Sequence, residues 1–569
     1  MNQPTPAIVA QGAVRRLPRV ALLLLCVAYV LPGFLGRAPL KSADMTAFGY
    51  MAELANGNSA WLSPRMMGLV PEVDALLPYW LGAWAMQLAP SWMPGDFAAR
   101  IPFILLLTLT LFATWYASYY LARNPQAQPV AFAFGGEALP PDYARAMADG
   151  ALLAFLACLG LAQLSHETTP ALAQLSFVAL SFFAFAARPF RTLAPAVCAV
   201  LGLGGLTLSG APALAALLGC GGALLCLLDR SPECGNRRAR LVWAGAIALL
   251  CAGLALLASW LNLWRWRIEL PQASWNEWQS MGRLLLWFTW PAWPLALWTL
   301  WRWRHQWLQV RTPSRHLALP LWFAGVAVAT TLATSSADRS LLLALPALAA
   351  LAAFALPTLK RSVAALIDWF TLLFFSGCAI SIWVIWIAMQ TGVPSQVAAN
   401  VVRLAPGFEQ SFSLFPFVIA ACATLAWGWL VKWRVGRHRA AIWKSLVLPA
   451  GGAVLCFLLL MTLWLPLFNF TRSYAPLVRR TVEVLGSQDC VEVHGLSQGH
   501  IAAFRFHGHL KTQAVDPADG CPWLIVNKDA LATLPDFVDL KRWSLHSNLR
   551  HPSDRDEDLL IYQRKTASP

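Results

Sequence analysis

The apolar run Val20-Ala-Leu-Leu-Leu-Leu-Cys-Val-Ala-Tyr-Val-Leu-Pro-Gly-Phe-Leu-Gly36 is followed directly by Arg37-Ala-Pro-Leu-Lys-Ser-Ala-Asp44-Met-Thr46. The run approaches the ~20 apolar residues that a membrane-spanning helix needs. The chain after it stays outside the bilayer until roughly residue 100, where the next such run begins. An acid kept beside hydrocarbon is costly, so Asp44 is a candidate functional residue. The alternative is a solvated loop acid or a helix cap.

Composition places the chain among multi-span membrane proteins. Of its 569 residues 58% are hydrophobic and 12% are charged, and it contains 29 Trp. A soluble globular domain does not reach these values. The formal charge of +15 does not indicate nucleic acid, because the basic residues fall in short clusters between apolar runs.

About thirteen apolar runs are long enough to be membrane spans. We predict a mostly α-helical fold with spans at 20–36, 101–121, 147–164, 171–187, 194–208, 212–228, 241–262, 284–301, 317–333, 340–357, 363–388, 412–431 and 444–466. An odd number of spans puts the two termini on opposite sides. Basic clusters precede the first span and fill alternate loops, so the positive-inside rule makes the N-terminus cytoplasmic. The loop 37–100 and everything after about 467 are then external.

The chain divides into two predicted domains. Residues 1–466 form the transmembrane domain with its long external loop, and residues 467–569 form a small soluble α/β domain whose apolar runs shorten to strand length. Cys490 and Cys521 lie in this external domain, and an oxidising compartment would permit a disulfide between them. The sequence leaves open whether they are close enough to bond.

The external loop carries a spaced series of residues: Asp44, Trp61, Pro64-Arg65, Gly68, Leu77 and Tyr79-Trp80-Leu81-Gly82. In order and spacing it resembles the first loop of the lipid A aminoarabinose transferases. Those enzymes belong with the protein mannosyltransferases among membrane glycosyltransferases of GT-C architecture.

Four later segments match the family in the same order. They are Ser165-His166-Glu167-Thr-Thr-Pro170, Leu206-Thr-Leu-Ser209-Gly210-Ala-Pro212, Thr334-Ser-Ser-Ala-Asp338-Arg339 before a Leu-Pro-Ala-Leu segment, and Arg472-Ser-Tyr474-Ala-Pro476-Leu477. Thirteen spans with a periplasmic C-terminal domain is also the plan of that family.

The chain departs from the family at charged positions. The second acid of the family's Asp-Glu pair is Met45, and two family lysines fall on Asp74 and Ser209. The family's donor-binding lysines are therefore lost or replaced by other cations.

The resemblance implies transfer of a sugar from a polyprenyl-phosphate carrier to an envelope acceptor at the periplasmic face of a bacterial inner membrane. The acceptor is lipid A, another glycan or a protein, and the reaction is inverting. In this reading Asp44 is the catalytic base, assisted by Glu167. Cations suited to the donor phosphate are Arg65, Arg339, Lys41 and Arg267. Residues suited to the acceptor or sugar are His166, Tyr79 and Trp80.

Each assignment has a structural alternative. Arg339 could lie at a helix end beside Asp338, and Glu167 could be a helix N-terminal acid. Arg65 could bind lipid headgroups, and His166 could be a hydrogen-bonded interfacial residue. Asp149 falls near the cytoplasmic end of a span, so we do not predict it to be the second catalytic acid.

The expected partners are the lipid-linked donor, a lipid or glycan acceptor and membrane lipids, with no nucleic acid. No cofactor is specified; a divalent cation is possible, although neither Asp44 nor Glu167 has a second acid at ligand spacing. Two other functions stay open. A transporter or flippase would need more intramembrane charge and broken helices. A non-catalytic binder of lipid-linked glycans is consistent with the lost lysines.

Overall fold

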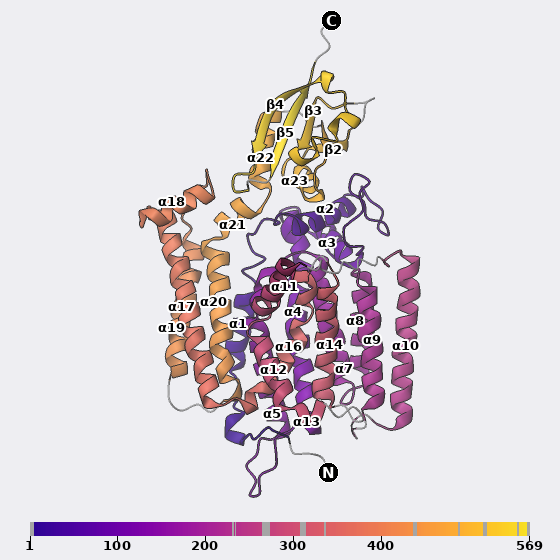
Figure 1. The fold of residues 1–569 in the computed structure, drawn as a ribbon, viewed down its shortest axis with the longest axis vertical. Coiled ribbons are helices and arrows are strands. Elements are labelled where there is room, and N and C mark those ends of the chain that lie inside the picture. Colours follow the sequence, from indigo (N-terminus) through magenta and orange to yellow (C-terminus); the bar gives the residue numbers. More distant parts are fainter. Residues whose placement is uncertain are drawn as a thin grey trace.

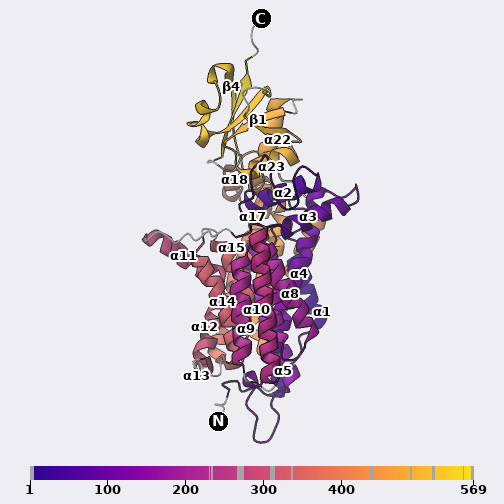
Figure 2. The same cartoon turned by 90° about the vertical axis from the view of Figure 1, so that its right-hand side faces the viewer.

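The computed structural model describes residues 5–565 apart from 230, 232, 234, 265–273, 308–313, 335–336, 436–440, 487–489, 516–519 and 555–556. Figure 1 shows a helical bundle with a small sheet domain above it. The N-terminus lies at the opposite end of the molecule from that domain. Figure 2 shows the sheet domain continuing the long axis of the bundle. The predicted mostly helical fold with a small C-terminal α/β domain is confirmed.

Within the part of the chain that the structure describes, seven helices are long and apolar enough to cross a membrane. They comprise α4 (Gly95–Ala122), α7 (Pro170–Ala187), α10 (Arg237–Trp260), α14 (Arg315–Leu332), α17 (Arg361–Thr391), α19 (Leu414–Val435) and α20 (Val447–Leu463) with the turn before it. Shorter apolar helices stand beside them: α1 (Arg19–Val30), α8 (Leu193–Leu208), α9 (Pro212–Leu228) and α16 (Leu345–Ala355).

Three predicted spans are broken, so the count of thirteen is not confirmed. The breaks separate α5 (Pro140–Ala157) from α6 (Leu159–Leu164), α11 (Trp275–Phe288) from α12 (Ala292–Arg302), and α15 (Ala337–Leu342) from α16. The first two breaks lie against each other, because the Leu159 N–H donates to the Trp290 carbonyl oxygen over 3.2 Å. A Cβ on Gly160 would lie 2.2 Å from the Phe288 ring, so only glycine permits this approach. Hydropathy averaged over a window hides such breaks.

The external loop is itself folded. It contains α2 (Ala43–Ala55) and α3 (Leu77–Leu88), which lie between the bundle and the sheet domain in Figure 1. Asp44 is in the first turn of α2, where a carboxylate complements the helix dipole. The short helices α13 (Arg304–Trp307) and α18 (Ser395–Leu404) lie at opposite ends of the bundle.

The C-terminal domain begins with α21 (Leu465–Arg472) and α22 (Ala475–Leu485). Its described residues form five strands, β1 (Cys490–His494), β2 (Lys511–Ala514), β3 (Trp523–Asn527), β4 (Trp543–Arg550) and β5 (Asp558–Arg564), in the order β2-β1-β3-β5-β4. β1 pairs in parallel with both β2 and β3, and β5 runs antiparallel to β3 and β4. The helix α23 (Gln498–His507) makes the crossover from β1 to β2. Cys490 and Cys521 form a disulfide with a Cα–Cα distance of 5.4 Å.

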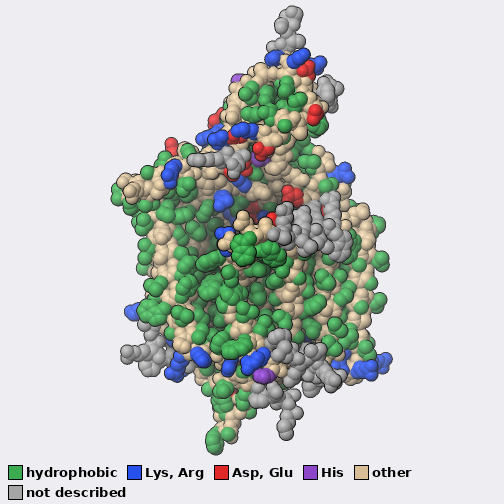
Figure 3. All heavy atoms as spheres, viewed as in Figure 1, with side chains coloured by type: hydrophobic (Ala, Val, Ile, Leu, Met, Phe, Trp, Pro, Cys, Tyr) green, Lys and Arg blue, Asp and Glu red, His purple; other side chains and the backbone are tan. Residues whose placement is uncertain are grey.

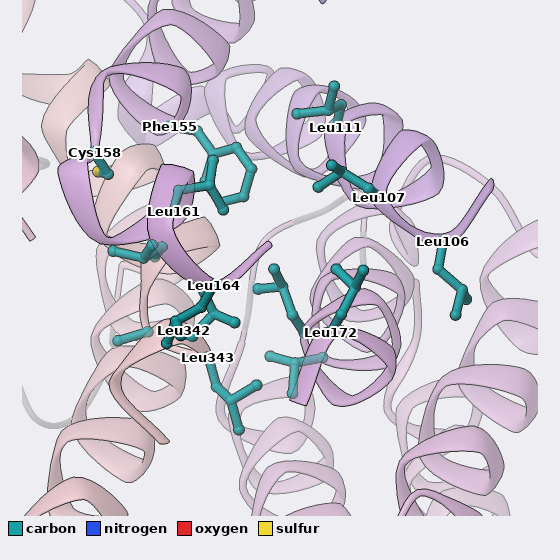
Figure 4. Packing of buried hydrophobic residues seen from close by; sticks show 14 of the residues in the cluster. Leu106, Leu107, Leu111, Phe155, Cys158, Leu161, Leu164, Leu172, Leu342 and Leu343 are labelled. Carbon is teal, nitrogen blue, oxygen red and sulfur yellow. The ribbon is translucent and has the colours of Figure 1, made fainter. Parts of the chain in front are cut away.

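A leucine-rich core supports the outer end of the bundle. In Figure 4 Leu107 and Leu111 of α4 face Phe155 of α5 and the α6 side chains Leu161 and Leu164. These residues are fully or almost fully buried. Close packing of this kind fixes the position of the turn that joins α6 to α7. That turn carries Glu167.

Figure 3 shows a broad band of hydrophobic side chains across the visible face of the bundle, with Lys and Arg along its lower edge. Acidic and basic side chains gather again above the band, below the C-terminal domain. This distribution is that of a protein seated in a bilayer.

Candidate functional site

Asp44 lies in a fully hydrogen-bonded position at the outer end of the bundle. One carboxylate oxygen, Oδ1, accepts the Thr168 backbone N–H over 2.7 Å and the Thr168 hydroxyl over 2.6 Å. The other, Oδ2, accepts from Arg37 Nη2 over 3.1 Å and from the Leu40 backbone N–H over 3.0 Å. Only 2% of the residue is exposed. Asp44 therefore joins the loop after α1 to the α6–α7 turn.

Two arginines complete this junction. Arg37 Nη2 also donates to the His166 carbonyl oxygen over 2.7 Å, so one guanidinium joins Asp44 to the α6–α7 turn. Arg100 of α4 pairs with Asp96 over 3.2 Å and donates to the Phe34 carbonyl oxygen over 3.4 Å. Buried charges in proteins persist when they are paired and hydrogen-bonded in this way.

These partners decide the ionisation of Asp44. Burial alone would raise its pKa, but the charge of Arg37, the bonds from Thr168 and Leu40 and the charge of Arg100 outweigh burial. They hold the pKa of Asp44 below its ordinary value. A carboxylate with a low pKa and both oxygens occupied is a weak proton acceptor.

Glu167 has the opposite electrostatic setting. Burial and the nearby charge of Asp44 raise its pKa to about 7, against the opposing charges of Arg339 and Arg37. Its Oε2 lies 3.4 Å from Arg339 Nη2, and the Arg339 side chain is one-third exposed. The site thus holds two carboxyl groups with different proton affinities, which is the arrangement typical of acid–base chemistry.

His166 is part of the scaffold. Its Nε2 lies 3.0 Å from the Tyr29 carbonyl oxygen, and its Nδ1 lies 3.2 Å from Ser165 Oγ. The ring stacks on Phe457 at 4.4 Å between centroids and is 1% exposed. With both nitrogens engaged and its faces covered, His166 has no group free for the acceptor or sugar contact predicted from the sequence.

Lys41 has a role that the sequence did not indicate. Its Nζ lies 3.1 Å from Asp554 Oδ2 and 2.9 Å from Glu557 Oε2, both in the C-terminal domain. The same ammonium lies 5.9 Å from the centre of the Tyr474 ring. Because two carboxylates already neutralise it, Lys41 is poorly placed to bind the donor phosphate as predicted. It connects the segment before Asp44 to the C-terminal domain.

A second contact between the domains runs along α2. Arg505 of α23 pairs with Glu53 over 2.7 Å, and Phe506 of α23 meets Phe48 edge-on at 4.6 Å. Gly499 packs against Ser42, whose φ of +65° is unusual for a residue with a side chain. The close approach of Gly499 to Ser42 supports this backbone conformation.

Replacing Lys41 with methionine should therefore loosen the C-terminal domain. We expect faster proteolysis in the segment 465–475, because the ion pairs of Lys41 with Asp554 and Glu557 connect the C-terminal domain to the segment before Asp44. The measurement is limited proteolysis of the purified protein.

The matched control is Lys528→Met, which removes a lysine paired with Asp558 over 3.0 Å inside the C-terminal domain. It should leave proteolysis in 465–475 unchanged. If Lys41→Met left proteolysis in 465–475 unchanged, the connection between the two domains would not depend on Lys41.

The aromatic residues of the first loop organise the loop itself. The Tyr79 hydroxyl donates to the Val73 carbonyl oxygen over 3.3 Å, and Trp80 Nε1 donates to the Trp61 carbonyl oxygen over 2.7 Å. Trp61 also stacks on Trp84. Arg65 is exposed on the same loop. None of these contacts joins Asp44 or Glu167, and the predicted sugar and phosphate roles of Tyr79, Trp80 and Arg65 stay predictions.

The two positions that lack the family lysines lie side by side. A Cβ on Gly210 would lie 3.0 Å from the Asp74 carbonyl oxygen, and the Leu76 N–H donates to the Leu208 carbonyl oxygen over 2.8 Å. The two departures therefore affect one region, next to α3 and the α8–α9 turn. Arg267, predicted as a compensating cation, lies outside the described residues.

Sequence reasoning missed Thr168 and Arg100. Thr168 belongs to a segment that the family resemblance had already marked, but nothing in it indicated a double hydrogen bond to Asp44. Arg100 stands four residues after Asp96, a helical spacing that indicates an ion pair.

Asp149 accepts a hydrogen bond from Trp115 Nε1 over 2.9 Å, inside the bundle. Among the described residues no group of three or more His, Cys, Asp or Glu is placed to hold a metal ion.

No known protein-family profile matches the chain, and no curated protein matches its sequence. Two solved structures match it along nearly the whole length. ArnT from Cupriavidus metallidurans in the apo state gives a TM-score of 0.59 at 14% identity, covering 95% of this chain and 96% of that chain. The chain has the ArnT fold.

The same enzyme bound to undecaprenyl phosphate gives a TM-score of 0.58 at 13% identity, covering 96% of this chain and 98% of that chain. ArnT is the lipid A aminoarabinose transferase, a GT-C enzyme, so the resemblance predicted from the loop motifs is confirmed at the level of the fold. The similarity includes the C-terminal domain as well as the bundle, because it covers almost all of both chains.

Proposed function

We propose that this ArnT-like protein is a multi-pass inner-membrane GT-C glycosyltransferase. It transfers a sugar from a polyprenyl-phosphate carrier to an envelope acceptor at the outer face. Two findings support this: the ArnT fold along the whole chain, with one of those structures bound to undecaprenyl phosphate, and the pairing of two carboxyl groups with cations at the outer end of the bundle. The single observation that carries the proposal is the ArnT fold, which covers 95% of this chain.

In the proposed reaction the acceptor oxygen attacks the anomeric carbon. The bond from that carbon to the carrier phosphate breaks, and polyprenyl phosphate leaves with the bonding electron pair. The acceptor proton passes to Glu167, whose raised pKa suits a base operating near neutral pH. Arg339 is close enough to Glu167 to meet negative charge on the leaving phosphate while it restrains the base.

This assignment reverses the roles expected from the sequence. Asp44 becomes the residue that positions Glu167, acting through Thr168 and Arg37, instead of the base. Its low pKa and four hydrogen bonds favour a permanent structural charge. Asp44 holds Thr168 at both its N–H and its hydroxyl. Because Thr168 follows Glu167 directly in the chain, these bonds also fix the Glu167 backbone.

The function can be tested in cells that lack the gene. Mass analysis of lipid A and other envelope glycans should reveal one sugar missing, restored by the wild-type chain and not by Glu167→Gln. Full restoration by Glu167→Gln would instead identify a non-catalytic binder. Loss of the sugar together with intracellular accumulation of its lipid-linked form would identify a flippase.

The pH profile follows from the ionisation of Glu167. A base must be deprotonated to act, so kcat/KM should rise with pH through a midpoint of about 7, the pKa of this carboxyl. Removing the cation in Arg339→Gln should raise that pKa and move the midpoint to higher pH. The profile of the transfer rate for the two proteins measures both effects. An unmoved midpoint would exclude Glu167 as the titrating group.

A further inference from the structure

At the opposite end of the bundle from Glu167, a cavity of about 400 Å³ opens between the end of α7 and the first turns of α10. It is lined by Arg188, Asn236, Arg238, Ala239, Val242, Trp243 and Ala246. Figure 2 shows α10 at the surface of the bundle nearest the viewer, with the N-terminal end of the chain below. No acidic residue is among the lining residues.

The cavity is basic at its mouth and apolar along its wall. Arg188 lies over the Trp243 ring at 5.0 Å from the centroid, which fixes the guanidinium at the edge of the hydrophobic band. Arg238 is exposed, and Val242, one turn further along α10, is 65% exposed. The apolar wall therefore faces the lipid, while the charges lie at the level of the headgroups.

Donor groups in this cavity are unsatisfied. Within the described part of the chain, Arg188 Nε and Trp243 Nε1 are both buried atoms without a hydrogen-bond partner. A buried donor left unpaired costs free energy, so two of them at one cavity favour an acceptor that the protein itself does not provide. The first backbone N–H groups of α10 add to the positive potential, because Arg237–Trp260 is a long helix and begins here.

The Asp229 carboxylate, at the end of α9, pairs with an arginine outside the cavity lining: it lies 3.8 Å from Arg315. A second cavity, lined by Leu227, Arg237, Arg240 and Leu241, flanks the other side of α10. The first turns of α10 are thus surrounded by cations on the side that the basic clusters make cytoplasmic.

We propose that the cavity formed by Arg188, Asn236, Arg238 and Trp243 binds the phosphodiester headgroup of an anionic membrane phospholipid. The guanidinium groups meet the phosphate oxygens, Trp243 Nε1 donates to the headgroup, and the acyl chains run along Val242 and Ala246. A basic pocket between helices at the inner face is the arrangement that recognises such lipids. The site is separate from the sugar-transfer site and independent of the proposed function.

The test is binding of phosphatidylglycerol to the purified full-length protein, measured by native mass spectrometry, with phosphatidylcholine as the neutral comparison. Arg188→Gln together with Arg238→Gln should weaken phosphatidylglycerol binding by about 30-fold, the loss of two basic contacts near a membrane surface. The matched control, Arg302→Gln with Arg361→Gln, removes two exposed arginines outside the cavity. It should change binding less than about twofold.

Equal losses in the two double variants would overturn the proposal, since charge alone would then explain the binding. Displacement of phosphatidylglycerol by an excess of inorganic phosphate would also overturn it, because a free anion would be the ligand. Should the Arg188 variant fail to fold, Arg238→Gln alone, at an exposed position, must still lower phosphatidylglycerol binding. Unchanged binding in that variant would contradict the assignment.

Discussion

Replacing Glu167 with glutamine is expected to reduce sugar transfer by about 10²–10⁴-fold, the usual contribution of a positioned general base. Glutamine keeps the size of the side chain and can still accept from Arg339 through its amide oxygen. The loss should therefore fall on the rate of transfer, with little change in the melting temperature of the purified protein. Rates measured at several pH values should also lose the acid limb near pH 7.

The control for this variant is Glu53→Gln. Glu53 is another buried glutamate paired with an arginine, 2.7 Å from Arg505. It lies between the two domains and outside the Asp44–Glu167 junction, so its replacement should affect stability more than rate. If Glu53→Gln and Glu167→Gln lowered the transfer rate equally, the result would contradict the assignment of Glu167 as the base.

The second large effect is expected for Asp44→Asn. This change leaves the Arg37 guanidinium, whose side chain is 4% exposed, without a counter-charge. Breaking one member of a buried pair costs about 3–5 kcal/mol. In asparagine an NH₂ group replaces one of the two carboxylate oxygens. This donor would face another donor, on either Thr168 or Leu40, so at least one hydrogen bond is lost as well. We expect a clear fall in melting temperature and little remaining transfer.

A double-mutant cycle separates stability from chemistry. Arg37→Gln combined with Asp44→Asn removes both charges, so it should recover part of the stability that either single change loses. Transfer should stay low, because Glu167 is no longer held through Thr168. Because the Asp44 charge helps to raise the Glu167 pKa, residual activity in Asp44→Asn should keep an acid limb that moves to lower pH if Glu167 is the base. If the limb disappears, Asp44 is the base, as the sequence suggested.

The fold could be predicted well from the sequence, because long apolar runs are its strongest pattern and each of them predicts a helix. Every predicted span overlaps a helix, and the change of composition after residue 466 marks the sheet domain. The breaks beside Cys158 and Trp290 escaped prediction, since they depend on two distant segments that contact each other. Leu159 donates to Trp290 across that contact, and no local pattern contains both residues.

The site was anticipated in part. Asp44, Glu167 and Arg339 come together as the loop motifs suggested, although they are far apart in the chain. Lys41 and His166 make structural contacts in this fold, and their predicted phosphate and sugar roles stay predictions. Lys41 is neutralised by Asp554 and Glu557 of the C-terminal domain, which a reading of the first loop alone does not include.

The sequence by itself determined the membrane class, the order of the spans, the separate C-terminal domain and the identity of the two carboxylates, because hydropathy and motif spacing are local properties of the chain. Only the tertiary structure decided the electrostatic setting of each carboxylate. The proton affinity of a side chain depends on the charges and donors around it, and those come from Arg37, Thr168 and Arg339 in three separate segments. Packing gives Asp44 four donors and a low pKa, and leaves Glu167 buried beside a negative charge with a pKa raised to about 7.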